Sequence, residues 1–330
     1  MMFQAVLSNR DHPEYGVATI PFPIPHDQYA YCIELLEALE IGDAAKADCK
    51  VEEVDSFFFV LKRTEMLTVN VEELNYLAKR LDSFVTGEAA QFQAMAHKLE
   101  LFELKDLINL TFCCQQATVI TDFSDLAAIG RDHYMNLHGG SASVDELNKL
   151  DVEKTAWQLI ENGGGTITPY GVIYDNGMKL EQIYDGRFFP CYYYEPNAIT
   201  VAVTAKSEPE DTEHITWLFL PMIQEEIDRA LLRGGITDPS EIRLSLEDSW
   251  LPHEVLDLLD MDHVDISELN ALVQALDEFS DMSMPSWSCP PPRGRFGTPW
   301  KRCGFRRTIS CTWRSKTTLP LSISRPTWMD

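Results

Sequence analysis

The sequence predicts an α+β protein in which a strand–strand–helix–strand unit, followed by a helical segment, is present twice. Short runs rich in β-branched and aromatic residues, ended by prolines, predict strands. Longer stretches with apolar residues three and four positions apart predict amphipathic helices. One such helix, at 69–84, has a close counterpart at 264–279. A pattern repeated at a fixed offset indicates a duplicated unit.

The helix expected at 69–84 has the sequence VNVEELNYLAKRLDSF. Asn70 is a favourable N-cap residue, and we expect the Glu73 carboxylate to reach back to the backbone N–H of that cap. The counterpart, VDISELNALVQALDEF, has Asp265 as its N-cap and Glu268 as the acidic residue of a capping box. We expect the leucines of both helices to face a core. The first helix leaves four polar residues on or near its wet side, namely Glu72, Glu73, Asn75 and Asp82.

The other elements occur in the same order in both units. In the first unit we expect strands at 2–8 and 17–22, a helix at 27–40 and a strand at 48–55. In the second unit we expect strands at 199–204 and 215–220, a helix at 224–233 and a strand at 241–248. Because residue identity between the units is low, the order of the elements carries the prediction of a repeat.

Between the units the pattern is less regular. Helical periodicity continues over 88–110, a short strand is expected at 118–121, and a further helix at 123–137. The segment SVDELNKL at 143–150 contains a Ser-x-x-Glu capping box but is short. The stretch 170–194 is rich in aromatic and turn residues and predicts antiparallel strands.

These patterns divide the chain into six parts. They are an α/β domain at 1–66, a helical segment with a following α/β segment at 67–140, a turn-rich, aromatic, β-rich segment at 141–197, a second α/β domain at 198–263, a truncated helical segment at 264–284, and a basic tail rich in proline and tryptophan at 285–330.

The tail at 285–330 differs abruptly in composition from the rest of the chain. It holds four of the seven tryptophans but no alanine and no glutamate. One interpretation is a nucleic-acid-binding tail with interleaved aromatic residues. The other, which we favour, is a stretch translated in a shifted reading frame. Because it has no helical or strand period, we expect it to be poorly ordered.

The charge of the chain is strongly acidic. There are 52 acidic and 27 basic residues, a net charge of −25. The tail has nine bases and one acid, so residues 1–284 hold 51 acids and 18 bases, a net charge of −33. Such a charge repels nucleic acid and membrane surfaces and attracts basic protein surfaces, although simple solubility is an alternative explanation.

The helix expected at 27–40 carries Glu34, Glu37 and Glu40 three positions apart on its outer side. Like charges at this spacing cost a helix about 0.2–0.5 kcal/mol per pair. Because these like charges lower the stability of the helix, their presence favours a functional role for them.

No catalytic or cofactor signature is found in the sequence. Phosphate-binding glycine motifs, an 18-residue apolar run and signal-peptide features are all lacking. Eight cysteines without CxxC spacing fit reduced thiols in a cytosolic protein, and the adjacent Cys113 and Cys114 predict buried structural thiols. The spacing of His133 and His138 and the segment 260–263 do not match metal ligands. We therefore expect no enzyme activity, no cofactor and no metal.

Several segments resemble the ArdA antirestriction proteins of conjugative plasmids and transposons. In the second unit these are WLFLPMIQEEIDRALLRGGITDPSEIRLSLEDSWLP and VDISELNALVQALDEF. In the first unit they are ATIPFPIPHDQYAYCIELLEAL, VNVEELNYLAKRLDSF and GEAAQFQAM, followed by ITDFSDLAAIGRDHYM. The resemblance covers residues 3–140 and 199–282. The LN-x-L-x-x-x-L-D pattern at 74–82 and 269–277 is similar to the antirestriction motif of that family.

The resemblance implies an elongated, homodimeric, cytoplasmic protein that does not itself bind nucleic acid or membranes. Its carboxylates would imitate DNA phosphates and occupy the DNA-binding groove of a type I restriction–modification enzyme. Family members usually carry one copy of the unit, so a shortened second copy is a departure. The alternative is an acidic interaction protein of a mobile element that binds another DNA-binding or defence protein. A third possibility is an enzyme acting in the aromatic stretch 170–194.

The residues expected to contact the partner are acids and motif residues from both units. They are Glu34, Glu37, Glu40, Glu72, Glu73, Asn75, Asp82, Glu225, Glu226, Asp228, Glu268, Asn270, Asp277 and Glu278.

Overall fold

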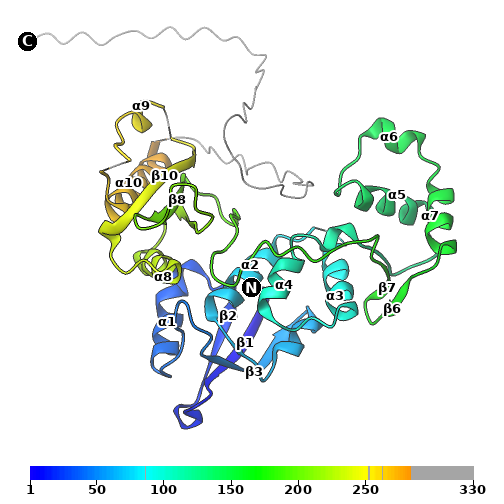
Figure 1. Ribbon diagram of the computed structural model, residues 1–330, viewed down its shortest axis with the longest axis horizontal. Coiled ribbons are helices and arrows are strands. Elements are labelled where there is room, and N and C mark those ends of the chain that lie inside the picture. The colour runs from blue at the N-terminus through cyan, green and yellow to red at the C-terminus, as the bar shows by residue number, and fades with distance from the viewer. Residues whose placement is uncertain (86, 252, 262, 284–330) are drawn as a thin grey trace, which may run out of the picture. The chain divides into compact units, whose positions relative to one another are not determined.

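A computed structural model describes residues 1–85, 87–251, 253–261 and 263–283 (Figure 1). It combines helices with three antiparallel sheets in this part of the chain, so the predicted α+β class is confirmed. Over the same ranges, no helix has both the length and the apolar character needed to cross a membrane. The tail at 285–330, for which poor order is predicted, lies outside the described residues.

The first sheet has the strand order β2-β1-β3-β4 and is antiparallel throughout. Its strands are β1 (Phe3–Asn9), β2 (Val17–Phe22), β3 (Cys49–Ser56) and β4 (Thr68–Val69). Buried and accessible residues alternate along β2, because one face of the sheet meets the core and the other meets water. The helix α1 (Tyr29–Glu37) follows β2 and buries Tyr29, Cys32, Ile33 and Leu36.

Helix α2 (Val71–Asp82) begins where the sequence predicts. The Asn70 side chain accepts hydrogen bonds from the backbone N–H groups of Glu72 and Glu73, at 3.0 and 3.2 Å. The predicted apolar stripe is buried, with Leu77 fully inaccessible to solvent. Helices α3 (Glu88–Lys98) and α4 (Leu104–Leu110) follow, and Figure 1 shows α4 beside α2.

The sheet, α1, α2, α3 and α4 share one hydrophobic core. Val71 and Leu74 of α2 are buried in the same cluster as the strand residues Ala5 and Val51. The boundary expected between 66 and 67 therefore does not separate two cores, because the first turns of α2 complete the core of the sheet.

A second core lies in the middle of the chain. The strands β5 (Thr118–Ile120), β6 (Thr166–Thr168) and β7 (Gly171–Tyr174) form a sheet of order β5-β7-β6. The helices here are α5 (Leu126–Leu137), α6 (Val144–Lys149) and α7 (Val152–Glu161). Ile129 of α5 and Leu159 of α7 are buried together with Ile120 and Tyr174. The boundary expected at 140 falls inside this cluster.

The prediction of a β-rich segment at 141–197 is wrong for most of its length. Residues 144–161 form two helices, because Ala156 and Leu159 give α7 an apolar face that packs on α5. The Ser143 capping box is formed with Glu146. Residues 175–198 contain no strand, since their aromatic side chains contact helices instead of joining a ladder.

The third sheet, of order β10-β8-β9, belongs to the second unit. Its strands are β8 (Ile199–Ala205), β9 (Thr216–Leu220) and β10 (Ile242–Ser249), and its helices are α8 (Gln224–Gly234), α9 (His253–Leu256) and α10 (Ile266–Ser283). Ile266, Leu269 and Val273 of α10 are buried with the strands, so the boundary expected at 263 does not divide this core. Short 3-10 helices lie at Pro13–Tyr15, His26–Gln28, Phe59–Thr64, Cys114–Gln116 and Pro239–Glu241.

The first and third sheets share structural details. The order β2-β1-β3 corresponds to β9-β8-β10. Each sheet has one register shift in its third strand, which leaves Glu52 and Glu247 without a strand partner. The peptide bonds Phe22–Pro23 and Leu220–Pro221 are both cis. The strand order and the matching register shifts are what a repeated unit is expected to show.

Candidate partner-binding surface and aromatic cleft

Part of the predicted acidic set lies on open helix surfaces. Glu34 and Glu37 of α1 are exposed, as is Glu40 just after it. Glu225 and Asp228 of α8 are exposed, and so are Asp82 at the end of α2 and Glu268 of α10. Asp277 and Glu278 belong to α10, but their side chains lie outside the described residues.

The asparagines of the motif have a structural role in place of the predicted contact role. Asn75 is 5% exposed and Asn270 is 4% exposed. The Oδ1 atom of Asn75 accepts a hydrogen bond from the backbone N–H of Ile24, and that of Asn270 accepts one from Met222, both at 2.9 Å. Each amide satisfies a backbone donor that follows the second strand of its unit. The prediction that they face a partner is wrong.

Glu72 and Glu73 are also engaged inside the protein. The Glu72 carboxylate accepts hydrogen bonds from Arg229 Nε at 2.6 Å and from the Tyr29 hydroxyl at 3.0 Å. The Glu73 carboxylate accepts one from the Tyr184 hydroxyl at 2.7 Å and lies 3.7 Å from Arg233. The expected reach of Glu73 back to its cap is therefore replaced by a tertiary contact. Burial raises the pKa of Glu73, opposed by the Tyr184 hydrogen bond and by Arg233.

Arg233 connects α8 to the start of α2. Its side chain is 5% exposed and lies over the ring of Phe189, 4.4 Å from the centroid. Its hydrogen bonds go to the carbonyl groups of Arg187, Ala44 and Gly186, to Asn70 Oδ1 and to the Tyr184 hydroxyl. Arg233 is not among the site residues predicted from the sequence. The available signal was its spacing of four from Arg229 on a helix of an otherwise acidic chain.

Phe189 and Tyr192 of the aromatic segment 188–194 pack their rings against α2. Phe189 stacks on Tyr76 at 4.4 Å with an interplanar angle of 5°. Arg80 lies 4.4 Å from the centroid of the Tyr192 ring. The Tyr76 hydroxyl donates a hydrogen bond to the carbonyl of Pro190. These stacking and cation–π contacts, each worth about 0.5–1.5 kcal/mol, attach the segment to the first unit.

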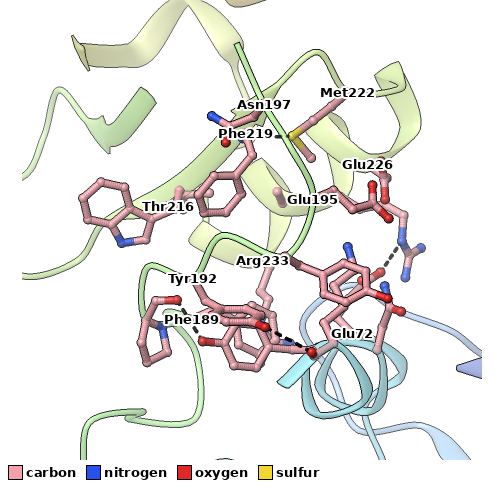
Figure 2. A pocket seen from close by; sticks show the side chains of 18 of the residues that line it. Glu72, Phe189, Tyr192, Glu195, Asn197, Thr216, Phe219, Met222, Glu226 and Arg233 are labelled. Carbon is pink, nitrogen blue, oxygen red and sulfur yellow. Dashed lines mark hydrogen bonds and ion pairs between the residues drawn. The ribbon is translucent and has the colours of Figure 1, made fainter. Parts of the chain in front are cut away.

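A cleft of about 200 Å³ lies between α2, α8, β9 and this aromatic segment. Figure 2 shows Glu195 and Glu226 together among its lining residues, with Phe219, Tyr192 and Phe189 also labelled. The Glu226 side chain is 14% exposed, and its carboxylate lies 3.5 Å from His26 Nδ1. Burial raises the pKa of Glu226, while Lys79 and His26 act to lower it. Glu226 therefore belongs to the cleft, not to the open surface where Glu225 and Asp228 lie.

The raised pKa of Glu226 predicts a pH-dependent stability difference. Folded protein retains the Glu226 proton to higher pH than unfolded protein does, so this group's contribution falls as pH rises through the folded-state pKa. We expect Glu226→Gln to be more stable than the wild type at pH 8, with the difference shrinking towards pH 4. Urea unfolding of both proteins at the two pH values measures this. A glutamine variant that is less stable at pH 8 contradicts the assignment.

The structure does not assemble a metal or thiol site in the part of the chain that it describes. No group of three or more His, Cys, Asp or Glu side chains there could hold a metal ion. Cys113 and Cys114 are buried, as predicted, and burial raises the pKa of Cys113 to about 11 and that of Cys114 well above its ordinary value. Thiols in this state are poor nucleophiles at neutral pH.

Comparisons with known proteins find no match for this chain among protein-family models, among curated proteins or among solved structures.

Proposed function

We propose that this protein is an antirestriction protein of the ArdA kind, an acidic DNA mimic that occupies the DNA-binding groove of a type I restriction–modification enzyme. The observation that carries the proposal is the large excess of acidic side chains that no basic side chain neutralises. Residues 1–284 have a net charge of −33. Within the described ranges, five ion pairs join Lys or Arg to an acid, namely Lys46–Asp43, Lys50–Glu52, Lys98–Asp175, Arg229–Glu72 and Arg233–Glu73.

Arg229 and Arg233 lie inside the protein, so they do little to neutralise its surface. The surface keeps a large excess of carboxylates, some of them on helices such as α1 and α8. DNA-binding grooves place Lys and Arg to meet about one phosphate charge per 1.7 Å of duplex. Carboxylates on folded helices can meet those bases without the cost of bending DNA, about 1–6 kcal/mol for a bent site.

Motif residues that are engaged inside the protein are left out of the contact surface that we propose. Glu72, Glu73, Asn75 and Asn270 hold the fold together. The exposed acids Glu34, Glu37, Glu40, Glu225 and Asp228 are the candidates for direct contact, together with Asp82 and Glu268.

Binding of the full chain to a purified type I restriction enzyme is expected to depend steeply on salt. Raising NaCl from 50 to 200 mM should weaken the complex at least about tenfold, because many opposite charges are screened together. A DNA duplex carrying the enzyme's target site should compete with the protein for the same groove. Fluorescence anisotropy of labelled protein measures both effects. Salt-independent binding, or simultaneous binding of the protein and the DNA duplex to the enzyme, would contradict the proposal.

A matched pair of variants controls for total charge. Glu34→Lys with Glu37→Lys changes two exposed acids of α1, and Glu153→Lys with Glu161→Lys changes two exposed acids of α7. Both variants alter the net charge equally. The α1 variant should lose more affinity than the α7 variant, and equal losses would assign the effect to net charge.

The alternative is that the chain binds another basic partner, such as a repressor or a defence protein. A pull-down from a host that lacks type I enzymes separates the two proposals. A restriction-protection assay in cells, with the full chain and with residues 1–284, tests the function itself.

A further inference from the structure

The outer face of β9 carries two aromatic rings, Trp217 and Phe219, and the Phe219 ring packs edge-on against Tyr193 of the aromatic segment, with ring centroids 5.3 Å apart. Leu218 and Leu220 are fully buried in the third sheet's core, whereas Trp217 and Phe219 alternate with them and line the cleft. In β2, the corresponding strand of the first unit, the equivalent positions hold Thr19 and Pro21. A sheet of this kind therefore forms without rings at these positions, and in β9 the two rings form part of the wall of the cleft.

The basic groups around the cleft are mostly committed to the protein's own acceptors. Arg229 donates to Glu72 and to the carbonyl of Gly42, and the Arg233 guanidinium is surrounded by acceptors. Lys79 lies 5.7 Å from the centroid of the Tyr194 ring. Within the described residues, no Lys or Arg lies over the ring of Trp217 or of Phe219.

Glu226 is a cleft acid that makes no ion pair with a Lys or Arg among the described residues, although Lys79 and His26 both act to lower its pKa. Among the described residues no Lys or Arg nitrogen lies within 4.0 Å of it, and its ion contact is with His26 at 3.5 Å. The Glu195 carboxylate adds to the negative potential, which raises the pKa of Glu226 further. A carboxylate that is mostly buried and has no close Lys or Arg is stabilised when a further cation is placed beside it.

We infer that this cleft binds one cationic side chain, an arginine or a lysine of a partner protein, between the rings of Trp217 and Phe219 and the carboxylates of Glu226 and Glu195. A volume of about 200 Å³ is more than ten times the roughly 10–15 Å³ of cavity space that one water molecule needs, so a side chain fits. Aromatic faces and carboxylates are the two groups that attract a guanidinium or ammonium ion. The identity of the partner as a restriction enzyme rests on the proposed function.

Capped peptides of four identical residues test this site on the full chain. Tetra-arginine, tetra-lysine and tetra-citrulline have similar lengths, and citrulline is a neutral analogue of arginine. Calorimetric titration at 150 mM NaCl should show saturable binding of one or both cationic peptides and none of the citrulline peptide. The stronger of the two cationic peptides identifies the side chain preferred.

Two variants locate the binding. Glu226→Gln removes the buried charge, and Glu241→Gln removes an exposed charge of the same unit outside the cleft. We expect Glu226→Gln to weaken peptide binding at least about fivefold and Glu241→Gln less than about twofold. Phe219→Leu should also weaken binding, through loss of the ring. Circular dichroism spectra matching the wild type show that each variant is folded.

Equal losses for Glu226→Gln and Glu241→Gln would overturn the inference, because binding would then follow net charge. Citrulline binding as tight as arginine binding would also overturn it. The enzyme-binding assay separates this failure from that of the proposed function. If the wild type binds the restriction enzyme but the peptide results fail, the cleft is wrong and the DNA mimic stands. If the peptide results hold and the enzyme is not bound, the cleft serves a different basic partner.

Discussion

Replacing Arg233 by methionine is expected to lower the free energy of unfolding by about 3–5 kcal/mol, the usual effect of removing one partner from a buried charged network. The substitution keeps most of the apolar stem. It removes the donor to the carbonyl of Ala44 and to the Tyr184 hydroxyl oxygen in a site that is almost closed to water, while Asn70 Oδ1 keeps only its two backbone donors. Acceptors left unsatisfied in this way lose their solvation without compensation.

The loss should be concentrated where Arg233 makes its contacts. Hydrogen exchange is expected to rise in α8, in the segment 184–190 and in the first turn of α2, while α5 and α7 keep the wild-type rate. Arg10→Met is the matched control, because Arg10 is exposed on the loop after β1. If both variants unfold at the same urea concentration, the Arg233 network does not stabilise the protein.

Replacing Gly130 by alanine is expected to destabilise the middle core by about 1–3 kcal/mol, the usual range for overpacking. Helix propensity alone predicts the opposite, a gain of about 0.8–1.0 kcal/mol for alanine over glycine inside a helix. A Cβ atom at Gly130 would lie 1.8 Å from the carbonyl oxygen of Val152. Because that obstacle is the backbone at the start of α7, a side-chain rotation cannot relieve it.

Whether Gly130→Ala lowers or raises the stability decides between overpacking and helix propensity as the larger effect. Hydrogen exchange of α5 and α7 measures it locally, with α2 as the reference from a different core. Arg131→Ala, at the next position of the same helix, is exposed and should change stability by less than about 0.5 kcal/mol. Slower exchange in Gly130→Ala would show that α5 and α7 are not in close backbone contact.

The local elements were predictable because their signals lie within a few residues of one another. The cap at Asn70 and the buried leucines of α2 follow from neighbours three and four positions apart. The strands β2 and β9 are short apolar runs with a proline within or directly after them. The segment 141–197 was mispredicted because its helices are short and its aromatic residues carry a strand signal, while their contacts are with distant helices.

The sequence by itself determined the α+β class, the order of the elements in the two units, the caps and the acidic charge. Only the tertiary structure decided which acids are free. Glu72 meets an arginine 157 positions away, and Asn70 meets one 163 positions away, and no local pattern encodes such pairs. The same long-range packing brings Glu226 beside His26 and the rings of β9, because a cleft exists only where separate elements meet.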